Sequence, residues 1–420
     1  MFNVGILTIG DEVRIGQVVN TNAAWLSSQI TETGAFVTEH RTIGDDRDKM
    51  LTEIDYLFKN NDLLITTGGL GPTHDDITKP VLLDYFNDKL VFSNEVFTSL
   101  QHYLNFRNRE ITDVVKNQAF IPETCTPLEN KVGTAPGLLF ERDGKYLISL
   151  PGVPAEVKYI TTAHIIPFVQ KLIQSRKDEV VFYRTLQTIG AFESDLAEMI
   201  GNVNQFLGES SLAFLPSYQG VRLRIGAKAQ TFDEAKIELD RITKILYQCA
   251  GKYIISEEDK RLAQLVGDKL NELNATIAVA ESCTGGLLGK EMTDIAGSSS
   301  YFLGGIISYS NEAKINLLNV NRKTIEEYGA VSEQTAIEMA SNVRNIFNSN
   351  YGVSITGIAG PDGGTPLKPV GTVWIGISSE KHTHARLFHF GEIREVNRER
   401  AVGMALTMVM EMLNNGVAQK

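Results

Sequence analysis

The chain has 420 residues, which at about 150 residues per domain predicts more than one folded domain. Hydrophobic residues make up 43% and charged residues 22%, a composition that excludes a disordered or collagen-like chain, and no apolar run reaches the roughly 20 residues of a membrane helix. The net charge of -11, without a Lys/Arg block, argues against nucleic-acid binding, and three scattered cysteines (Cys125, Cys249, Cys283) fit neither a disulfide framework nor a CxxC metal site.

The first region, residues 1–175, alternates short apolar runs with helical patterns. We expect strands at 4–9, 35–37, 63–67 and 146–150, with helices between them and a last helix that runs to about residue 174. This alternation predicts a parallel sheet covered by helices on both faces. The first strand begins at once, without a basic leader, so we expect no export signal and a reducing, cytoplasmic location.

A charged stretch at 174–179 marks a boundary, and residues 176–256 form a small module. Its pattern predicts strands and helices in an α+β arrangement, without an obvious cluster of reactive side chains. The expected strands are 180–188, 212–215 and 221–228, and the expected helices are 194–200 and 232–249.

The third region, residues 257–420, is again α/β. Strands are expected at 276–280, 305–309, 353–356 and 372–378, among amphipathic helices, one of which Ser332 is placed to cap. The sequence therefore predicts two three-layer α/β domains with mostly parallel sheets, joined by a small α+β module.

The sharpest motif is AESCTGG at residues 280–286, between an expected strand and an expected helix. Ser282 can act there as a nucleophile, because the backbone N–H groups of residues 283–286 at a helix N-terminus can hold a phosphate or the oxyanion of an acyl transfer. The alternative is a serine that caps the helix, with glycines for tight packing.

A serine nucleophile needs a base, and the second motif, GGIISYSNEAK at 304–314, contains a candidate. The seven histidines offer no obvious partner. A lysine can serve when burial lowers its pKa, and Lys314 and Tyr309 lie near one strand end, where both could face the same cleft. The alternatives are a solvated helix lysine and a half-buried strand tyrosine.

A third loop, TGIAGPDGG at 356–364, directly follows a strand and presents its backbone to a close ligand. Taken alone it could be a plain long turn. Three such loops, each at the carboxyl end of a strand, lie at the edge where open α/β sheets bind ligands, and together they predict a site.

These three motifs closely resemble the C-terminal domain of the CinA (competence/damage-inducible protein A) family, from about residue 257 to the end. That domain is a nicotinamide mononucleotide (NMN) deamidase, so the resemblance implies hydrolysis of NMN to nicotinate mononucleotide and ammonia, in pyridine nucleotide salvage and without a metal or cofactor. It makes Ser282 the nucleophile and Tyr309 and Lys314 its activating partners. It also implies a substrate-site arginine, for which Arg394 and Arg398 both fit and Arg398 is preferred.

An amide is a poor electrophile, so a deamidase must activate its serine and stabilise the tetrahedral oxyanion. Lys314 and Tyr309 can pass the proton from Ser282 towards departing ammonia, and a glycine loop and an arginine can hold the ribose phosphate. The residues expected to bind substrate are Cys283, Thr284, Gly285, Gly286, Thr356, Gly357, Gly360, Arg394 and Arg398.

The N-terminal region carries another glycine loop, TTGGLGPTHDDIT at 66–78. Its glycine N–H groups can cradle a pyrophosphate, while an aspartate beyond the loop holds a divalent cation. Other acidic residues end the first strand or follow residue 44, so several could meet in one cleft; the alternative is that each is a loop acid in a turn. The expected nucleotide site is Gly68, Gly69, Gly71 and Thr73, and the expected metal ligands are Asp11, Asp45, Asp75 and Asp76.

Together with LPGVPAE at 150–156, this region resembles the molybdopterin-binding (MogA/MoeA-like) fold. In the CinA family it is associated with metal-dependent ADP-ribose pyrophosphatase activity, which implies a divalent metal ion. The middle module is likened to a KH-type fold but lacks a GxxG loop, the nearest segment being PSYQG at 216–220, so RNA binding through it is not expected.

The leading hypothesis is an NMN amidohydrolase at 257–420, joined through the module at 176–256 to a nucleotide pyrophosphatase domain at 1–175. One alternative is that only the N-terminal domain is active, as a pyrophosphatase or a molybdopterin-type nucleotidyl enzyme. Another is a non-catalytic accessory protein in competence or DNA-damage response. The expected partners are the nucleotides NMN and ADP-ribose and a second copy of the chain, with no nucleic acid and no membrane.

Overall fold

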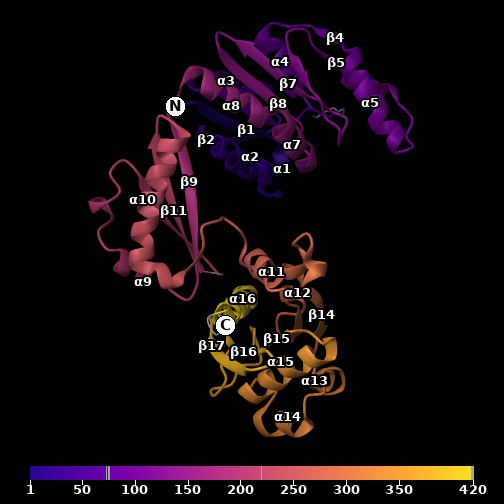
Figure 1. Cartoon of the computed structure of the whole chain (residues 1–420). Coiled ribbons are helices and arrows are strands. Elements are labelled where there is room, and N and C mark those ends of the chain that lie inside the picture. Colours follow the sequence, from indigo (N-terminus) through magenta and orange to yellow (C-terminus); the bar gives the residue numbers. More distant parts are fainter. Residues whose placement is uncertain (72, 74–75, 219, 418–420) are drawn as a thin grey trace. The chain divides into compact units, whose positions relative to one another are not determined.

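The structure is a computed structural model that describes residues 1–71, 73, 76–218 and 220–417 (Figure 1). Contacts between Cα atoms divide the chain into two units, Met1–Tyr183 with Gly226–Arg241, and Arg184–Ile225 with Ile242–Lys420. No helix among the described residues is long and apolar enough to cross a membrane.

The N-terminal sheet is parallel at its centre. Its central strands pair in parallel, and two strands add to one edge in antiparallel pairing. From one edge to the other the strands are β2 (Phe36–Ile43), β1 (Asn3–Ile9), β3 (Leu63–Thr67), β8 (Lys145–Leu150), β7 (Gly137–Arg142) and β6 (Thr126–Leu128).

Helices cover both faces of this sheet, because its central strands are apolar on both sides. One buried cluster joins β1 and β3 to α2 (Thr21–Glu32), α7 (Pro154–Ile160) and α8 (Ile166–Arg176). A second cluster on the other face joins them to α3 (Arg47–Asn60) and α4 (Thr78–Phe86). The remaining elements are α1 (Asp11–Arg14), β4 (Leu90–Phe92), α5 (Asn94–Phe106), α6 (Asp113–Lys116) and β5 (Phe120–Pro122), with β4 paired to β5.

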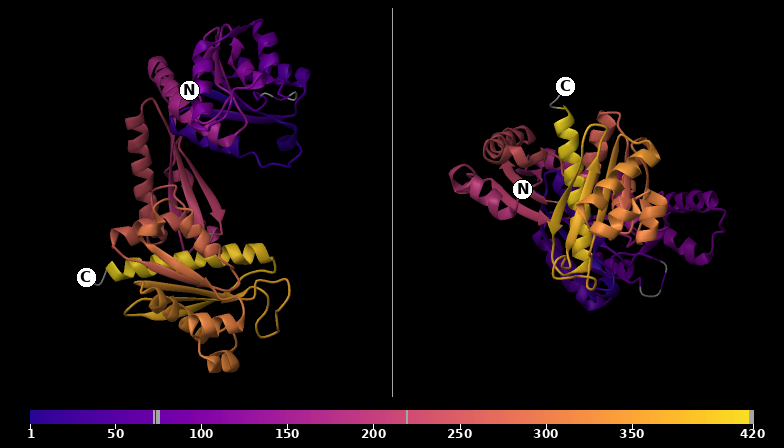
Figure 2. Two further views of the ribbon diagram at one scale, coloured as in Figure 1. Left: turned by 90° about the vertical axis from the view of Figure 1, so that its right-hand side faces the viewer. Right: turned by 90° about the horizontal axis from the view of Figure 1, so that it is seen from below.

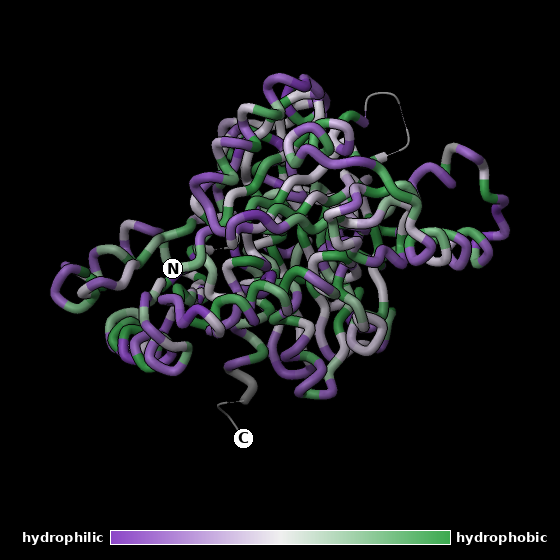
Figure 3. Tube along the Cα trace, turned by 90° about the horizontal axis from the view of Figure 1, so that it is seen from above, coloured by the Kyte–Doolittle hydropathy of each residue, from purple (hydrophilic) through white to green (hydrophobic). Residues whose placement is uncertain are grey.

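The middle module has a sheet with the order β10 (Ser211–Ser217), β11 (Gly220–Ala229), β9 (Val180–Thr188), β12 (Ile254–Ser256). Its helices are α9 (Glu193–Ile200) and α10 (Phe232–Ala250). Hydrophobic (green) and hydrophilic (purple) residues are interspersed along the tube of the chain, as expected for elements with one apolar face (Figure 3).

The C-terminal sheet differs from the sequence-based expectation of mostly parallel pairing. Three strands pair in parallel and two more add in antiparallel pairing, so parallel and antiparallel pairs are equal in number. The difference arises because β16 runs back beside β15 after a long loop, and because the short turn from β16 to β17 requires antiparallel pairing. The order is β14 (Phe302–Ile307), β13 (Ile277–Glu281), β15 (Tyr351–Gly357), β16 (Thr372–Ser378), β17 (Thr383–His389).

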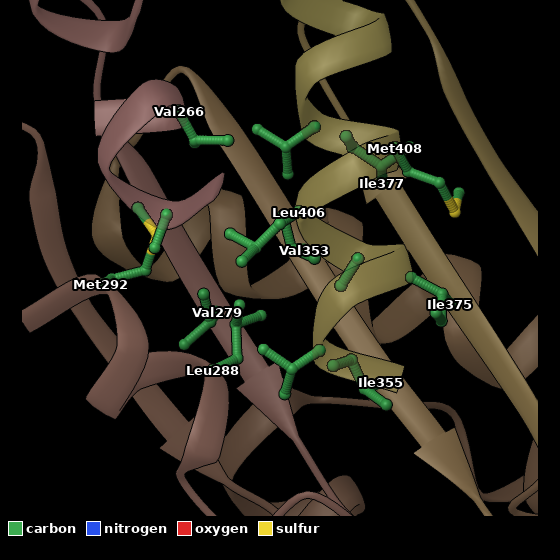
Figure 4. Close-up of a cluster of buried hydrophobic side chains, with 14 of the residues drawn as sticks. Val266, Val279, Leu288, Met292, Val353, Ile355, Ile375, Ile377, Leu406 and Met408 are labelled. Carbon is green, nitrogen blue, oxygen red and sulfur yellow. The ribbon is translucent and has the colours of Figure 1, made fainter. Parts of the chain in front are cut away.

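Helices again cover both faces of this sheet (Figure 2). On one face α11 (Leu262–Glu272), α12 (Leu287–Thr293) and α16 (Arg394–Val417) enclose the largest apolar cluster, where their side chains meet those of β13, β15 and β16 (Figure 4). On the other face lie α13 (Asn311–Leu318), α14 (Arg322–Tyr328) and α15 (Glu333–Phe347). Ser332 caps α15 as predicted, because its Oγ accepts a hydrogen bond from the N–H of Thr335.

Candidate active site

The carboxyl ends of β13, β14 and β15 lie side by side in the C-terminal domain. In the register of the sheet Glu281 pairs with Ile307 on one side and with Ile355 on the other. The N–H of Ser282 donates to the carbonyl of Ile355 over 3.0 Å. The loops that follow these three strands therefore share one edge, which is where parallel strands present their loop residues to a ligand.

Lys314 reaches into this edge from α13 and contacts Ser282. Its Nζ lies 2.9 Å from the Oγ of Ser282 and donates to the carbonyl oxygen of Ser308 over 2.7 Å, and the side chain is only 1% exposed. Burial lowers the pKa of Lys314 to about 8, against a smaller opposing influence of Cys283. The alternative of a solvated lysine is therefore wrong: this amine is buried, largely free of its proton above pH 8, and in contact with the serine.

Tyr309 lies at the rim of the same site. Strand β14 ends at Ile307, two residues earlier than the sequence predicted, and the side chain of Tyr309 is 61% exposed. Its hydroxyl accepts a hydrogen bond from Nη2 of Arg394 over 3.1 Å. Within the described chain it makes no hydrogen bond to Ser282 or Lys314, so the two predicted activating partners have different surroundings.

Both candidate arginines reach this edge from the first turns of α16. Nη1 of Arg394 donates to the carbonyl oxygen of Gly360 over 2.7 Å, and Nη2 of Arg398 donates to that of Thr284, also over 2.7 Å. Between them, the buried side chain of Asn397 donates to the carbonyl of Ala359 over 3.0 Å. Arg398 is thus tied to the loop that carries Ser282, and Arg394 to the third glycine loop.

The turn after Ser282 is built differently from the expectation. Helix α12 begins at Leu287 and its N-cap is Gly286, so Ser282 does not cap it. The N–H of Gly285 donates to the carbonyl of Ser282, and the N–H of Gly286 donates to the carboxylate of Glu281. Two of the four backbone N–H groups predicted to bind an oxyanion therefore already donate hydrogen bonds within the turn. The other two, those of Cys283 and Thr284, donate to none of the described residues.

Glu281 is the residue that the motif analysis missed. Its carboxylate is 1% exposed and accepts hydrogen bonds from the N–H groups of Gly286, Leu288 and Gly289 over 3.0, 3.1 and 2.8 Å. These N–H groups lie at the start of α12, where a helix has no carbonyl partners of its own. In the sequence the one available signal was the position of this glutamate, directly between an apolar strand and the SCTGG turn.

The other predicted residues of this domain line the same edge or support it. The hydroxyl of Thr356 donates to the carbonyl of Ala330 over 2.7 Å, at the end of β15 that also contains Gly357. Gly360 has a φ of +90°, and a Cβ there would lie 2.5 Å from Val370, so this turn requires glycine. Burial raises the pKa of the Cys283 thiol to about 11, which keeps it protonated and unreactive.

The N-terminal domain has a separate cavity of about 550 Å³ at the carboxyl ends of its strands. It brings together several residues that the sequence predicted to bind a nucleotide, and also Glu12 and Glu156. The predicted residues that line it are Gly68, Gly69, Gly71, Asp45 and Asp76.

The predicted metal ligands do not all face this cavity. The carboxylate of Asp11 pairs with Arg14 at 2.8 Å and does not line it, whereas Asp76 accepts a hydrogen bond from the N–H of Thr73 over 2.8 Å. Asp75 lies outside the described residues. Carboxylates suit a divalent cation, but within the described ranges no three acidic, histidine or cysteine side chains are grouped closely enough to hold one.

Glu156 adds a titratable group that the sequence reading did not single out as a site residue. Its carboxylate accepts a hydrogen bond from Nδ2 of Asn130 over 2.7 Å. Burial raises the pKa of Glu156, and the hydrogen bond from Asn130 opposes that shift. Gly133 allows this position, because a Cβ there would lie 2.1 Å from the Glu156 side chain.

Comparison with known proteins assigns a family to each region. Residues 5–171 match the family described as "Probable molybdopterin binding domain", residues 183–256 match the damage-inducible protein CinA KH domain, and residues 259–413 match the CinA C-terminal domain.

Relatives match along almost the whole chain. A CinA-like protein of Salinibacter ruber is 44% identical over 96% of this chain and 97% of its own length, and one of Chloroherpeton thalassium is 40% identical over 97% and 99%. The crystal structure of the competence/damage inducible protein CihA from Agrobacterium tumefaciens is 37% identical and covers 36% of this chain and 93% of its own, with a TM-score of 0.36. The extent and identity of the full-length matches show that this chain belongs to the CinA family.

Proposed function

We propose that the C-terminal domain is an amidohydrolase that converts NMN to nicotinate mononucleotide and ammonia. The observation that carries this proposal is the buried contact between Nζ of Lys314 and Oγ of Ser282. A serine hydroxyl in hydrogen-bond contact with a neutral amine forms a pair in which the serine is the nucleophile and the amine is its base. Attack on an unreactive amide requires such a pair.

The expected reaction proceeds through an acyl-enzyme. Lys314 takes the proton of Ser282 as Oγ attacks the carboxamide carbon, and the N–H groups of Cys283 and Thr284 are the donors available to the oxyanion. The ammonium of Lys314 then gives its proton to the amide nitrogen, the C–N bond breaks, and ammonia leaves. Water hydrolyses the ester with Lys314 again as the base, which releases nicotinate mononucleotide and regenerates Ser282.

The other polar groups at this edge suit the far end of a nucleotide. Arg394 and Arg398 hold two permanent positive charges, and Arg is well matched to phosphate oxygens. Helix α12 offers no comparable site, because the carboxylate of Glu281 already accepts its first N–H groups. We therefore propose that the phosphate of NMN lies towards α16 and the carboxamide lies at Ser282.

The burial of Lys314 also argues against a non-catalytic role for this domain. In the described chain no acidic side chain acts on Lys314, and an unpaired buried lysine lowers stability. A purely structural protein would gain from replacing it with an apolar residue. Retention of such a residue beside a serine is typical of an active site.

The N-terminal cavity supports a second proposed activity, the hydrolysis of the pyrophosphate of ADP-ribose. Its volume of about 550 Å³ and its glycine loop at residues 68–71 fit a nucleotide with a pyrophosphate. We expect this activity to require a divalent metal ion, with Asp76 and Asp45 among the acidic residues that it depends on.

Two full-length variants test both proposals at once. Ser282→Ala is expected to lose NMN deamidation and to keep ADP-ribose cleavage, and Asp76→Ala is expected to do the reverse. Ammonia release from NMN and AMP formation from ADP-ribose with Mg²⁺ are measured for both proteins. Full deamidation by the Ser282→Ala protein would overturn the first proposal, and unchanged metal-dependent cleavage by the Asp76→Ala protein would overturn the second.

A further inference from the structure

We infer that Glu281 is a positioning residue of the C-terminal site, whose side chain fixes the turn that carries the oxyanion donors. This inference rests on the proposed deamidase function and deepens it. It concerns a residue that does not touch the reacting atoms and acts through Ser282, Ser308 and the turn between β13 and α12.

The side chain of Glu281 determines the shape of the turn after the nucleophile. Its two carboxylate oxygens accept the N–H groups of Gly286 and Leu288 on one side and of Gly289 on the other. The turn can wrap around the carboxylate because Gly286 has a φ of +97°, a conformation that other residues rarely adopt. With these donors occupied, Cys283 and Thr284 follow Ser282 with N–H groups that donate to none of the residues that the structure describes.

The main chain at position 281, whatever its side chain, contacts the residue that orients the base. Its carbonyl oxygen accepts the N–H of Ser308 over 2.7 Å, and the carbonyl oxygen of Ser308 in turn accepts a hydrogen bond from Nζ of Lys314. One residue therefore links the loop of the nucleophile to the residue that orients its base. Small displacements of such groups have large effects on rate, because a misplacement of about 1 Å can cost about 10²-fold.

The negative charge of Glu281 also bears on the direction in which the substrate binds. A buried carboxylate at the start of α12 repels a second anion there, whereas a neutral carboxamide is not repelled. The positive charges of Arg394 and Arg398 lie on α16 instead. Glu281 therefore favours the orientation of NMN in which the amide, and not the phosphate, lies next to Ser282.

The variant Glu281→Gln tests this role. A glutamine oxygen can replace the oxygen that accepts Gly286 and Leu288, but its NH₂ group then faces the N–H of Gly289 and cannot accept it. We expect kcat for NMN to fall about 10²-fold with KM within about threefold of the wild-type value, because the oxyanion donors act on the transition state.

A matched control is Asn350→Ala, directly before β15, which contacts the chain just before the amino end of β13. Oδ1 of Asn350 accepts the N–H and the hydroxyl of Thr276, so this variant also removes hydrogen bonds that hold β13 but leaves the loop of Ser282 untouched. Its kcat should stay within about threefold of wild type. An equal loss of kcat in both variants, a change in KM alone, or wild-type kcat in Glu281→Gln would overturn the inference.

Two readouts separate this inference from the deamidase proposal itself. Phosphonylation of Ser282 by a fluorophosphonate needs the same base and oxyanion donors but no NMN, and it should slow in Glu281→Gln and not in Asn350→Ala. Amide hydrogen exchange of the wild-type protein tests the inference without a variant, and therefore also if Glu281→Gln does not fold. The amides of Gly286, Leu288 and Gly289 should be protected, and rapid exchange of all three would overturn the inference even if NMN is deamidated.

Discussion

Nζ of Lys314 and Oγ of Ser282 lie 2.9 Å apart in the interior of the C-terminal domain. Apart from Ser282, the carbonyl of Ser308 is the hydrogen-bond partner of this amine in the described chain. A neutral amine suits these surroundings, because it donates one N–H to the carbonyl and accepts the serine proton with its lone pair. The chemistry proposed for the domain follows from this pair, and so does its pH dependence.

Deamidation should depend on the neutral form of Lys314. Burial lowers the pKa of Lys314 from 10.5 to about 8, so kcat/KM should fall about tenfold for each pH unit below 8 and level off above it. A profile of kcat/KM for NMN from pH 6 to 9.5 measures this limb. A limb centred near 6.5, which would point to a histidine, would contradict the assignment.

The same shift predicts how stability depends on pH. Between pH 8 and 10.5 the unfolded chain holds a proton on Lys314 that the folded chain has lost, so stability rises with pH across this window. Relative to Lys314→Met, the wild-type free energy of unfolding should increase by up to about 3 kcal/mol from pH 8 to pH 10.5. Urea denaturation of both proteins at several pH values measures the difference, and Ser282→Ala is a control that keeps the lysine. If the free energy of unfolding depends on pH in the same way in the wild type and in Lys314→Met, the pKa of Lys314 is not lowered.

Tyr309 should contribute to substrate binding more than to proton transfer. Its hydroxyl is bonded to Arg394 at the exposed rim, so Tyr309→Phe removes one hydrogen bond, worth about 1 kcal/mol, from an arginine of the proposed phosphate site. We expect KM for NMN to rise about fivefold and kcat to change less than that. A drop in kcat of about 10²-fold or more would instead show that the hydroxyl carries a proton in the reaction.

The two arginines of α16 should make the enzyme prefer a substrate with a phosphate over one without it. Arg398→Met and Arg394→Met should each raise KM for NMN by about tenfold or more, because each removes a charged partner of the phosphate. Nicotinamide riboside, which lacks that phosphate, should be deamidated slowly by wild type and at nearly the same rate by both variants. Equal losses with NMN and with the riboside would mean that the arginines support the loops through Gly360 and Thr284 and do not bind phosphate.

Much of the C-terminal site follows from the sequence, because apolar runs ending in glycine loops mark strands whose carboxyl ends meet. Residue type and spacing made Ser282 and Lys314 candidates but left a helix cap and a solvated lysine open, and their roles came from the resemblance of three motifs to the CinA family. The different surroundings of Lys314 and Tyr309 could not be predicted from a spacing of five residues. They depend on how α13 packs, which turns the lysine inward and leaves the tyrosine at the rim.

Glu281 shows a second limit of the sequence. A glutamate at the end of a strand is usually a solvated loop residue, and only the path of the folded backbone brings three N–H groups around this carboxylate. The antiparallel direction of β16 and β17 was not predicted for a related reason, since an apolar run does not reveal the direction of its neighbour.

The central claim is that Ser282 and Lys314 deamidate NMN. The most direct measurement is product formation by the full-length protein from NMN in ¹⁸O-labelled water. Ammonia is assayed, and the mass of the nicotinate mononucleotide is measured by mass spectrometry. We predict one ammonia for each nicotinate mononucleotide, one ¹⁸O in its carboxylate, and the loss of both products in Ser282→Ala. No ammonia from the wild-type protein, or undiminished ammonia from Ser282→Ala, would contradict the account.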